Sequence, residues 1–189
     1  MTYRERNDEH RDTFRIIITT LEKVLEITKV WGIVYIDESG MDHNEVKSRS
    51  WSPVGKPISS EQYWYRYKRT TLLAGVRWDE VVAPMRFEWS TNTDIFNTWV
   101  EECLCPELNP WDVVVLDNAS FHKNEKTRIL IEKRGATLLF LPPYSPDLNP
   151  IENYWALLKL YVRKHNSSFD IFYQILDEFM SREKWCWLS

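Results

Sequence analysis

Apolar residues recur at helical spacing in five segments of the chain, with charged and polar residues between them. Side chains three and four positions apart lie on one face of an α-helix, so each segment is predicted to be an amphipathic helix. The third segment ends at a glycine, which is typical of a helix C-terminus. The helices are expected at residues 8–29, 90–104, 120–135, 151–164 and 169–185.

Short runs rich in apolar and β-branched residues predict five strands. Two of the runs are apolar on both faces, as strands inside a sheet are, and they lead to Asp37 and Asp117. We expect these aspartates at the C-terminal ends of their strands. The second and third runs predict an antiparallel meander, and the whole pattern predicts an α/β fold. The strands are expected at residues 30–39, 70–78, 81–89, 111–118 and 136–141.

The stretch LFLPPYSPDLNPIENYW, residues 139–155, joins the last strand to the fourth helix. Its prolines predict an extended loop, because residues that precede proline avoid the helical region. Asn149 is predicted to cap the helix, with Pro150 at the first helical position. Glu152 then has two interpretations: it reaches back to a backbone N–H as in a capping box, or it forms one corner of an active site.

The carboxylates of Asp37 and Asp117 meet if the two buried strands are neighbours. Glu152 is then expected to point across at the two strand ends. Alternation along a strand places Asp37 and Asp117 on the same faces as the apolar residues two positions before them. A single aspartate at a strand end more often starts a turn, and Glu152 alone would be assigned to capping. The prediction of a shared acidic site therefore depends on the conjunction of all three.

A group of three carboxylates needs a cation. Two carboxylates about 4 Å apart repel each other by roughly 4 kcal/mol at an effective dielectric constant near 20. Oxygen ligands favour Mg²⁺ or Mn²⁺, whereas Zn²⁺ prefers His and Cys. Cys103 and Cys105 lack a second ligand pair at a suitable spacing, so we assign them to helix packing rather than to zinc.

Composition and charge limit the classes of protein. The 189 residues, 43% of them hydrophobic, suit one folded domain. No apolar run approaches about 18 residues, which excludes a membrane-spanning role. Three cysteines and an N-terminus without a signal-peptide pattern predict a cytoplasmic protein. The net charge of −4 argues against a nucleic-acid partner unless divalent cations balance the acidic residues, as in metal-dependent nucleases.

Three motifs resemble those of the DDE transposases of the Tc/mariner-like superfamily, in particular its bacterial insertion-sequence branch. They are VYIDESG, VVVLDNASFHK and LLFLPPYSPDLNPIENYWALLK, and the resemblance covers roughly residues 30–165. It implies an RNase H-like fold with a five-stranded mixed sheet flanked by helices. It places Asp37 on the first strand, Asp117 on the fourth and Glu152 on a following helix.

The same resemblance implies a chemistry. Asp37, Asp117 and Glu152 would hold two Mg²⁺ ions, with Mn²⁺ able to substitute, for cutting DNA at element ends and joining the 3′-OH to target DNA. The implied partners are terminal inverted repeats, target DNA and a second copy in a homodimer. The implied location is the cytoplasm of a bacterium, in association with the nucleoid.

Members of that superfamily normally carry N-terminal helix-turn-helix domains, whereas about thirty residues precede the first catalytic strand here. We expect residues 1–30 to be a helical remnant or linker and residues 31–189 to be the catalytic domain. Three explanations stay open: a helix-turn-helix region encoded in an upstream frame, a truncated remnant, or a fragment.

Five further residues are candidate DNA contacts: Arg49, Lys56, His122, Lys159 and Arg163. Arg49 and Lys56 flank a turn, and Lys159 and Arg163 are about one helical turn apart, as residues that follow a phosphate backbone would be. His122 either contacts metal-bound water or DNA, or packs at the start of a helix. Solvated or packed side chains are the alternative for every one of these residues.

Two other functions stay open. The first is that of another RNase H-like nuclease, such as a junction resolvase. The second is that of a catalytically dead, repurposed DNA-binding remnant. The proline-rich motif argues against the first, and the intact set of three carboxylates argues against the second.

Overall fold

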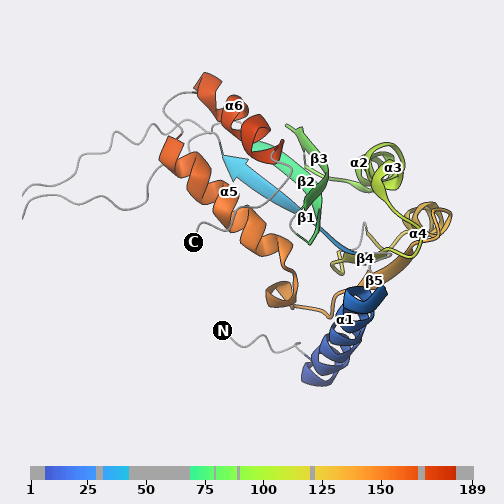
Figure 1. The fold of residues 1–189 in the computed structure, drawn as a ribbon. Coiled ribbons are helices and arrows are strands. Elements are labelled where there is room, and N and C mark those ends of the chain that lie inside the picture. The colour runs from blue at the N-terminus through green and yellow to red at the C-terminus, as the bar shows by residue number, and fades with distance from the viewer. Residues whose placement is uncertain are drawn as a thin grey trace, which may run out of the picture.

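The computed structural model describes residues 7–28, 32–42, 69–78, 80–88, 90–119, 122–165 and 169–181. Within these ranges the chain forms a five-stranded sheet with helices on both faces (Figure 1). The strands are β1 (Ile33–Asp42), β2 (Arg69–Arg77), β3 (Glu80–Phe87), β4 (Val113–Leu116) and β5 (Thr137–Phe140). The helices are α1 (Asp8–Thr28), α2 (Thr93–Trp99), α3 (Cys105–Glu107), α4 (Glu125–Glu132), α5 (Ile151–His165) and α6 (Phe169–Met180). A π-helical segment, η1 (Val100–Leu104), joins α2 to α3, and a short 3-10 turn, η2 (Pro146–Leu148), precedes α5.

The order of the strands is β3-β2-β1-β4-β5. The β1–β2 and β2–β3 pairs are antiparallel, whereas the β1–β4 and β4–β5 pairs are parallel, so the sheet is mixed. The predicted α/β class, the five strands and the antiparallel meander are confirmed. The adjacency of β1 and β4, on which the acidic site depends, is also present. No helix in the described part of the chain is long and apolar enough to cross a membrane.

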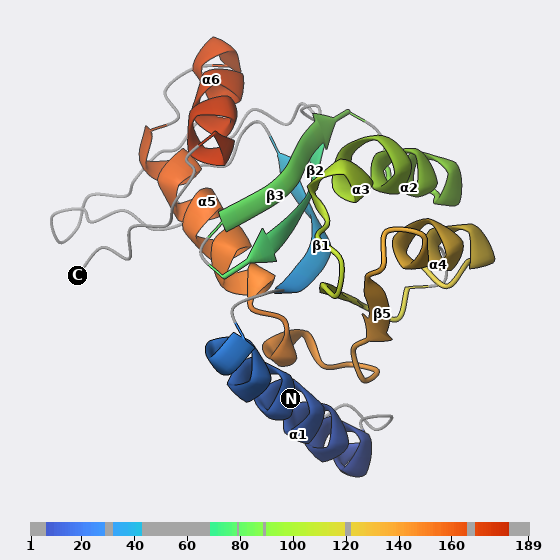
Figure 2. The same ribbon diagram turned by 45° about the vertical axis from the view of Figure 1, so that its right-hand side comes forward.

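Two hydrophobic cores lie on opposite faces of the sheet. Residues of β1 and β4 alternate between them: Tyr35 and Val115 face the core formed with α1, α5 and α6, while Val34 and Val114 face the core formed with α2, η1 and α3. Figure 2 shows α5 and α6 on one side of the sheet and α2, α3 and α4 on the other. The strands are buried on both faces, which is why they read as continuous apolar runs.

A buried aspartate holds β1 and β4 in register at their N-terminal ends. Asp112 is fully buried, and its Oδ1 accepts a hydrogen bond from the backbone N–H of Gly32 at 2.7 Å. Its Oδ2 accepts from Arg77 at 2.7 Å. A Cβ on Gly32 would lie 2.9 Å from Cγ of Arg77, so this close approach requires glycine. The register set here determines which residues meet at the other end of the strands.

The helix predicted at residues 90–104 is divided into α2, η1 and α3. Two further differences from the predicted bounds lie close to the acidic residues. Strand β1 continues beyond Asp37 to Asp42, because residues 38–42 pair with β2, so Asp37 lies inside the strand and not at its end. Helix α4 begins later than predicted, at Glu125, because the side chain of Asn124 accepts from the backbone N–H of Thr127 and caps the helix there. Its C-terminal end agrees with the prediction, since Gly135 takes a positive φ of 78° just beyond it.

Helix α1 is tied to the proline-rich loop. Arg11 is only 1% exposed, and its two terminal nitrogens donate to the two carboxylate oxygens of Asp147 at 3.0 and 2.5 Å. Asp147 belongs to η2, which leads directly into α5. Helix α1 also buries apolar side chains in the same core as α5: Phe14, Ile18 and Leu25. The helix therefore braces the loop that positions Glu152.

We expect Asp147→Ala to lower the free energy of unfolding by about 2 kcal/mol, because the buried Arg11 guanidinium loses its charged acceptor. A double variant with Arg11→Met should recover part of this loss. Urea unfolding measures both. The control is Asp12→Ala, which breaks the exposed 3.0 Å pair with Arg15 and should cost less than about 0.5 kcal/mol. Equal costs for the two single variants would contradict the bracing role.

Candidate active site

Asp37 and Asp117 lie side by side because β1 and β4 are parallel neighbours. Tyr35 pairs with Val115, and the same register continued by two residues places Asp37 beside Asp117. Alternation puts both carboxylates on the face of the sheet that α5 covers. Asp117 directly follows the last residue of β4.

Glu152 comes to the same place from the first turn of α5. Its neighbours Ile151, Tyr154 and Trp155 are buried against the sheet, while Glu152 itself is exposed. In the described part of the chain, no hydrogen bond engages the Glu152 carboxylate. The carboxylate is therefore not turned back to cap its own helix.

The predicted cap by Asn149 is wrong. Its side-chain Oδ1 is buried and has no hydrogen-bond partner among the described residues. The first backbone N–H groups of α5 bond to backbone instead: Glu152 donates to the carbonyl of Asn149 at 3.2 Å, and Asn153 to that of Pro150 at 3.1 Å. The side chain is left without a donor to accept from.

The three carboxylates line one pocket of about 530 Å³. The proline-rich loop forms one wall, and the residues that follow β4 form another. Lys123 is the one basic side chain that contributes to the lining within the described residues. The lining consists of Asp37, Asp117, Asn118, Ala119, Lys123, Leu141, Pro142, Pro143, Tyr144, Ser145, Pro146, Asn149 and Glu152.

The electrostatics of the pocket reflect the proximity of the three carboxylates. Burial raises the pKa of Asp37 from 3.8 to about 7, and the negative charges of Glu152, Glu38 and Asp117 contribute. Glu152 is the largest of these charge effects. Ionisation of Asp37 is therefore opposed first by its burial and then by repulsion from these carboxylates, which the backbone hydrogen bond at Glu38 offsets only in part.

The donor set fits a hard divalent cation. It offers the carboxylate oxygens of Asp37, Asp117 and Glu152 and the amide oxygen of Asn149, which has no hydrogen-bond partner among the described residues. No three His, Cys, Asp or Glu side chains among the described residues are already arranged to hold one metal ion.

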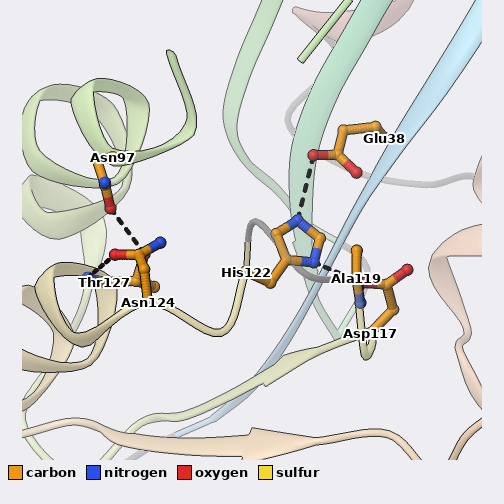
Figure 3. Close-up of polar contacts among 7 residues, drawn as sticks. All are labelled: Glu38, Asn97, Asp117, Ala119, His122, Asn124 and Thr127. Atoms are coloured by element: carbon orange, nitrogen blue, oxygen red, sulfur yellow. Dashed lines mark hydrogen bonds and ion pairs between the residues drawn. The ribbon is translucent and has the colours of Figure 1, made fainter. Parts of the chain in front are cut away.

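His122 joins Asp117 to a carboxylate on the other side of the sheet (Figure 3). Its Nδ1 lies 2.5 Å from Oδ1 of Asp117, and its Nε2 lies 3.2 Å from Oε1 of Glu38. The imidazole is 0% exposed and packs against Phe96 with ring centroids 4.3 Å apart. The predicted contact of His122 with DNA is wrong, because a buried ring offers DNA no surface. The packing alternative describes its position.

The charges in this group are mutually stabilising. Burial alone would lower the pKa of His122, but the hydrogen bonds to Asp117 and Glu38 raise it to about 9. Burial likewise acts to raise the pKa of Asp117, yet the hydrogen bonds from His122 and the Ala119 N–H bring it below its usual value. These contacts therefore favour the ionised form of Asp117, whereas the surroundings of Asp37 disfavour its ionised form.

The structure does not test the other four candidate DNA contacts. Lys159 is half-buried and Arg163 is exposed, and both lie on the face of α5 that carries Glu152, about two and three helical turns further on. Arg49 and Lys56 lie outside the described residues. Contact of these four residues with DNA stays a prediction.

Sequence reasoning missed two residues of the site, Glu38 and Lys123. Glu38 follows Asp37, so strand alternation turns it to the opposite face, away from the pocket considered in the prediction. Lys123 follows His122 and was assigned to a helix, although α4 begins only after it. The sequence feature that could have drawn attention to Glu38 is the acidic pair that it forms with Asp37.

A protein-family model described as the DDE superfamily endonuclease matches residues 32–174. The chain therefore belongs to the DDE endonuclease superfamily. The Tc3 transposase of Caenorhabditis elegans is 42% identical over 53 residues, 28% of this chain and 16% of that protein. An uncharacterized protein of Sinorhizobium fredii (strain NBRC 101917 / NGR234), y4pE/y4sA, is 43% identical over 47 residues, 25% of this chain and 33% of that protein. These matches confirm the resemblance to Tc/mariner-like DDE domains.

Solved structures of the Mos1 transposase share the fold. The Mos1 strand transfer complex superposes with a TM-score of 0.76 at 21% identity, over 97% of this chain and 56% of that one. The catalytic domain of the Mos1 mariner transposase superposes with a TM-score of 0.64 at 14% identity, over 97% of this chain and 85% of that one. The RNase H-like fold is thereby confirmed. The chain spans less than two thirds of the length of both curated relatives and of the complexed Mos1 chain.

Proposed function

We propose that this chain is the catalytic domain of a DNA transposase, with Asp37, Asp117 and Glu152 as its catalytic carboxylates. In this role it hydrolyses a phosphodiester bond at each element end and then joins the freed 3′-OH to target DNA. The observation that carries the proposal is the convergence of the three carboxylates, from β1, from the end of β4 and from α5, on one pocket. Membership of the DDE superfamily supports it.

Divalent cations are the proposed cofactor, with Mg²⁺ as the principal ion and Mn²⁺ able to substitute. Mos1 structures have been determined with each of these ions. The ligands would be Asp37, Asp117 and Glu152, whose oxygens suit such ions. A bound pair of Mg²⁺ ions supplies positive charge to the attacking and leaving oxygens of an in-line displacement at phosphorus, so no covalent nucleophile is needed from the protein.

The chain's own residues would orient the DNA strand. Lys123 is exposed at the pocket, and its positive charge acts on Asp117. It is suited to holding a non-bridging phosphate oxygen beside the carboxylates. Tyr144 lines the pocket and is 49% exposed, so it presents an aromatic face to a base next to the reacting phosphate. Lys159 and Arg163 would then follow the backbone along α5.

The proposed partners are the terminal inverted repeats of an element, target DNA and a second copy of the chain. Solved Mos1 complexes include a paired-end complex with the left transposon end. A homodimer would hold two ends together during joining. The proposed place of action is the bacterial cytoplasm, at the nucleoid.

Nicking of supercoiled plasmid tests the proposed activity. We expect open-circular product with Mg²⁺ or Mn²⁺ and none with EDTA, because the carboxylates act only with a cation between them and the phosphate. Asp117→Asn is the control for contaminating nuclease. Equal nicking by this variant and the wild type would end the catalytic assignment.

We expect Lys123→Gln to weaken DNA binding and to reduce the slope of log affinity against log salt by about 1, because one phosphate contact is lost. Fluorescence anisotropy with a labelled duplex, measured at several salt concentrations, gives the slope. Lys126→Gln is the matched control. Lys126 lies on the same segment but pairs with Glu101 at 3.0 Å, outside the pocket. A normal slope for Lys123→Gln would remove Lys123 from the DNA path.

A further inference from the structure

The Glu38–His122–Asp117 chain links a side chain on one face of the sheet to a carboxylate of the pocket on the other face. Glu38 follows Asp37 on β1, and alternation turns its side chain away from the pocket toward α2 and α4. His122 stands between Glu38 and Asp117, with 3.2 Å on one side and 2.5 Å on the other. Figure 3 shows the three side chains in this order, with a second oxygen of Asp117 pointing away from the imidazole.

Hydrogen bonds from His122 and Ala119 fix the orientation of the Asp117 carboxylate. Ionised carboxylates only accept, so each ring nitrogen of His122 donates to one of them. The backbone N–H of Ala119 also donates to Oδ1 of Asp117, at 2.9 Å. One carboxylate oxygen is thus engaged by two donors, whereas no hydrogen bond from the described residues engages the other oxygen, which is available to the pocket. Rotation of Asp117 would leave a fully buried imidazole N–H without its acceptor.

A second polar network holds the segment that carries His122. The side chain of Asn124 caps α4 at Thr127 (2.9 Å), and Oγ1 of Thr127 donates to Oδ1 of Asn97 on α2 at 2.8 Å. Figure 3 shows this network beside the histidine. Asn97 and Thr127 are buried, so the first turn of α4 is attached to α2 by one buried hydrogen bond. This network stabilises the start of α4 and makes no contact with the Asp117 carboxylate, so it can be broken separately from the His122 hydrogen bonds.

We propose that His122, backed by Glu38, is a positioning residue that holds the Asp117 carboxylate with one oxygen directed to the cation. This inference rests on the proposed function and assigns a role to two residues outside the pocket. Stability alone does not account for the arrangement, since apolar residues of similar volume serve a buried site at least as well as an ionic group. Partners that orient a metal ligand in this way typically change metal affinity or activity by about 10–100-fold when they are removed.

The first measurement is Mn²⁺ binding in the absence of DNA. The electron paramagnetic resonance signal of free Mn²⁺ monitors the titration. His122→Phe keeps the ring volume beside Phe96 but removes both hydrogen bonds. We expect it to weaken Mn²⁺ binding by about 10–100-fold, with a matching rise in the Mn²⁺ concentration for half-maximal plasmid nicking. Glu38→Gln keeps an acceptor for Nε2 and should fall at the lower end of that range. If His122→Phe does not fold, Glu38→Gln decides the question.

Thr127→Val is the matched control, because it breaks the neighbouring buried network without touching Asp117. We expect it to lower Tm by about 2–4 °C and to leave Mn²⁺ affinity within about twofold of wild type. Wild-type Mn²⁺ affinity in folded His122→Phe would overturn the positioning role, as would an equal loss of affinity in Thr127→Val. In both cases the proposed function stands if the wild type still nicks plasmid. A wild type that neither binds Mn²⁺ nor nicks overturns the proposed function and this inference with it.

Discussion

Glu152→Gln is expected to reduce Mg²⁺-dependent nicking by at least about 10²-fold without lowering the free energy of unfolding. Glutamine has nearly the same size and retains the ability to cap a helix, but it lacks the negative charge that a cation requires. The Glu152 carboxylate makes no hydrogen bond among the described residues, so its replacement leaves no partner unpaired. A capping role predicts the opposite pattern, with activity retained.

Plasmid nicking over a range of Mg²⁺ concentrations and urea unfolding in EDTA measure the two quantities. Glu125→Gln is the matched control, because Glu125 is also an exposed glutamate in the first turn of a helix but lies outside the pocket. Its activity should stay within about twofold of wild type. Full nicking by Glu152→Gln would exclude Glu152 from the reaction.

Asp37→Asn is expected to stabilise the metal-free protein, and more so as the pH rises. The pKa of Asp37 is raised from 3.8 to about 7 by burial and by the charge of Glu152. A group whose pKa is raised on folding favours the folded state at low pH and loses that contribution as the pH passes through the folded value. One pKa unit is worth about 1.4 kcal/mol, so the ionised carboxylate costs at most roughly 4 kcal/mol above pH 7. Asparagine avoids this cost.

Urea unfolding in EDTA at pH 5 and pH 8 tests this expectation. The gain from Asp37→Asn should be larger at pH 8, and added Mg²⁺ should stabilise the wild type but not the variant. Asp42→Asn, at the exposed end of the same strand, should change the free energy of unfolding by less than about 0.5 kcal/mol at either pH. A gain that does not vary with pH would contradict the account of Asp37.

The strands and helices, and the faces on which the acidic residues lie, followed from local patterns, whereas the mixed sheet that brings the acidic residues together was implied by the family resemblance. Apolar runs on both faces identified β1 and β4 as inner strands, and alternation placed Asp37 and Asp117 on one face. The proline-rich segment predicted a loop before α5, and Glu152 then fell in the first turn. Each of these inferences uses residues close together in sequence, where periodicity is informative.

Contacts between distant segments were not predictable in the same way. The burial of His122 depends on Glu38, 84 positions earlier, and on Phe96 of α2. The ion pair between Arg11 and Asp147 joins residues 136 positions apart. Neither pairing leaves a periodic signal, because a charged residue reads as exposed until its partner is known. The extension of β1 beyond Asp37 also depended on a partner, namely β2.

Because β1 and β4 share one register, the acidic site should tolerate insertions in the segments that connect these strands but not insertions within them. The β2–β3 hairpin and helix α2 lie between these strands in sequence but not between them in the sheet, so an insertion there leaves Asp37 beside Asp117. One residue inserted between Val113 and Leu116 would instead rotate Asp117 to the opposite face, away from Glu152. Natural variation in length should therefore collect in the connections, while these two strand segments keep a fixed count of residues.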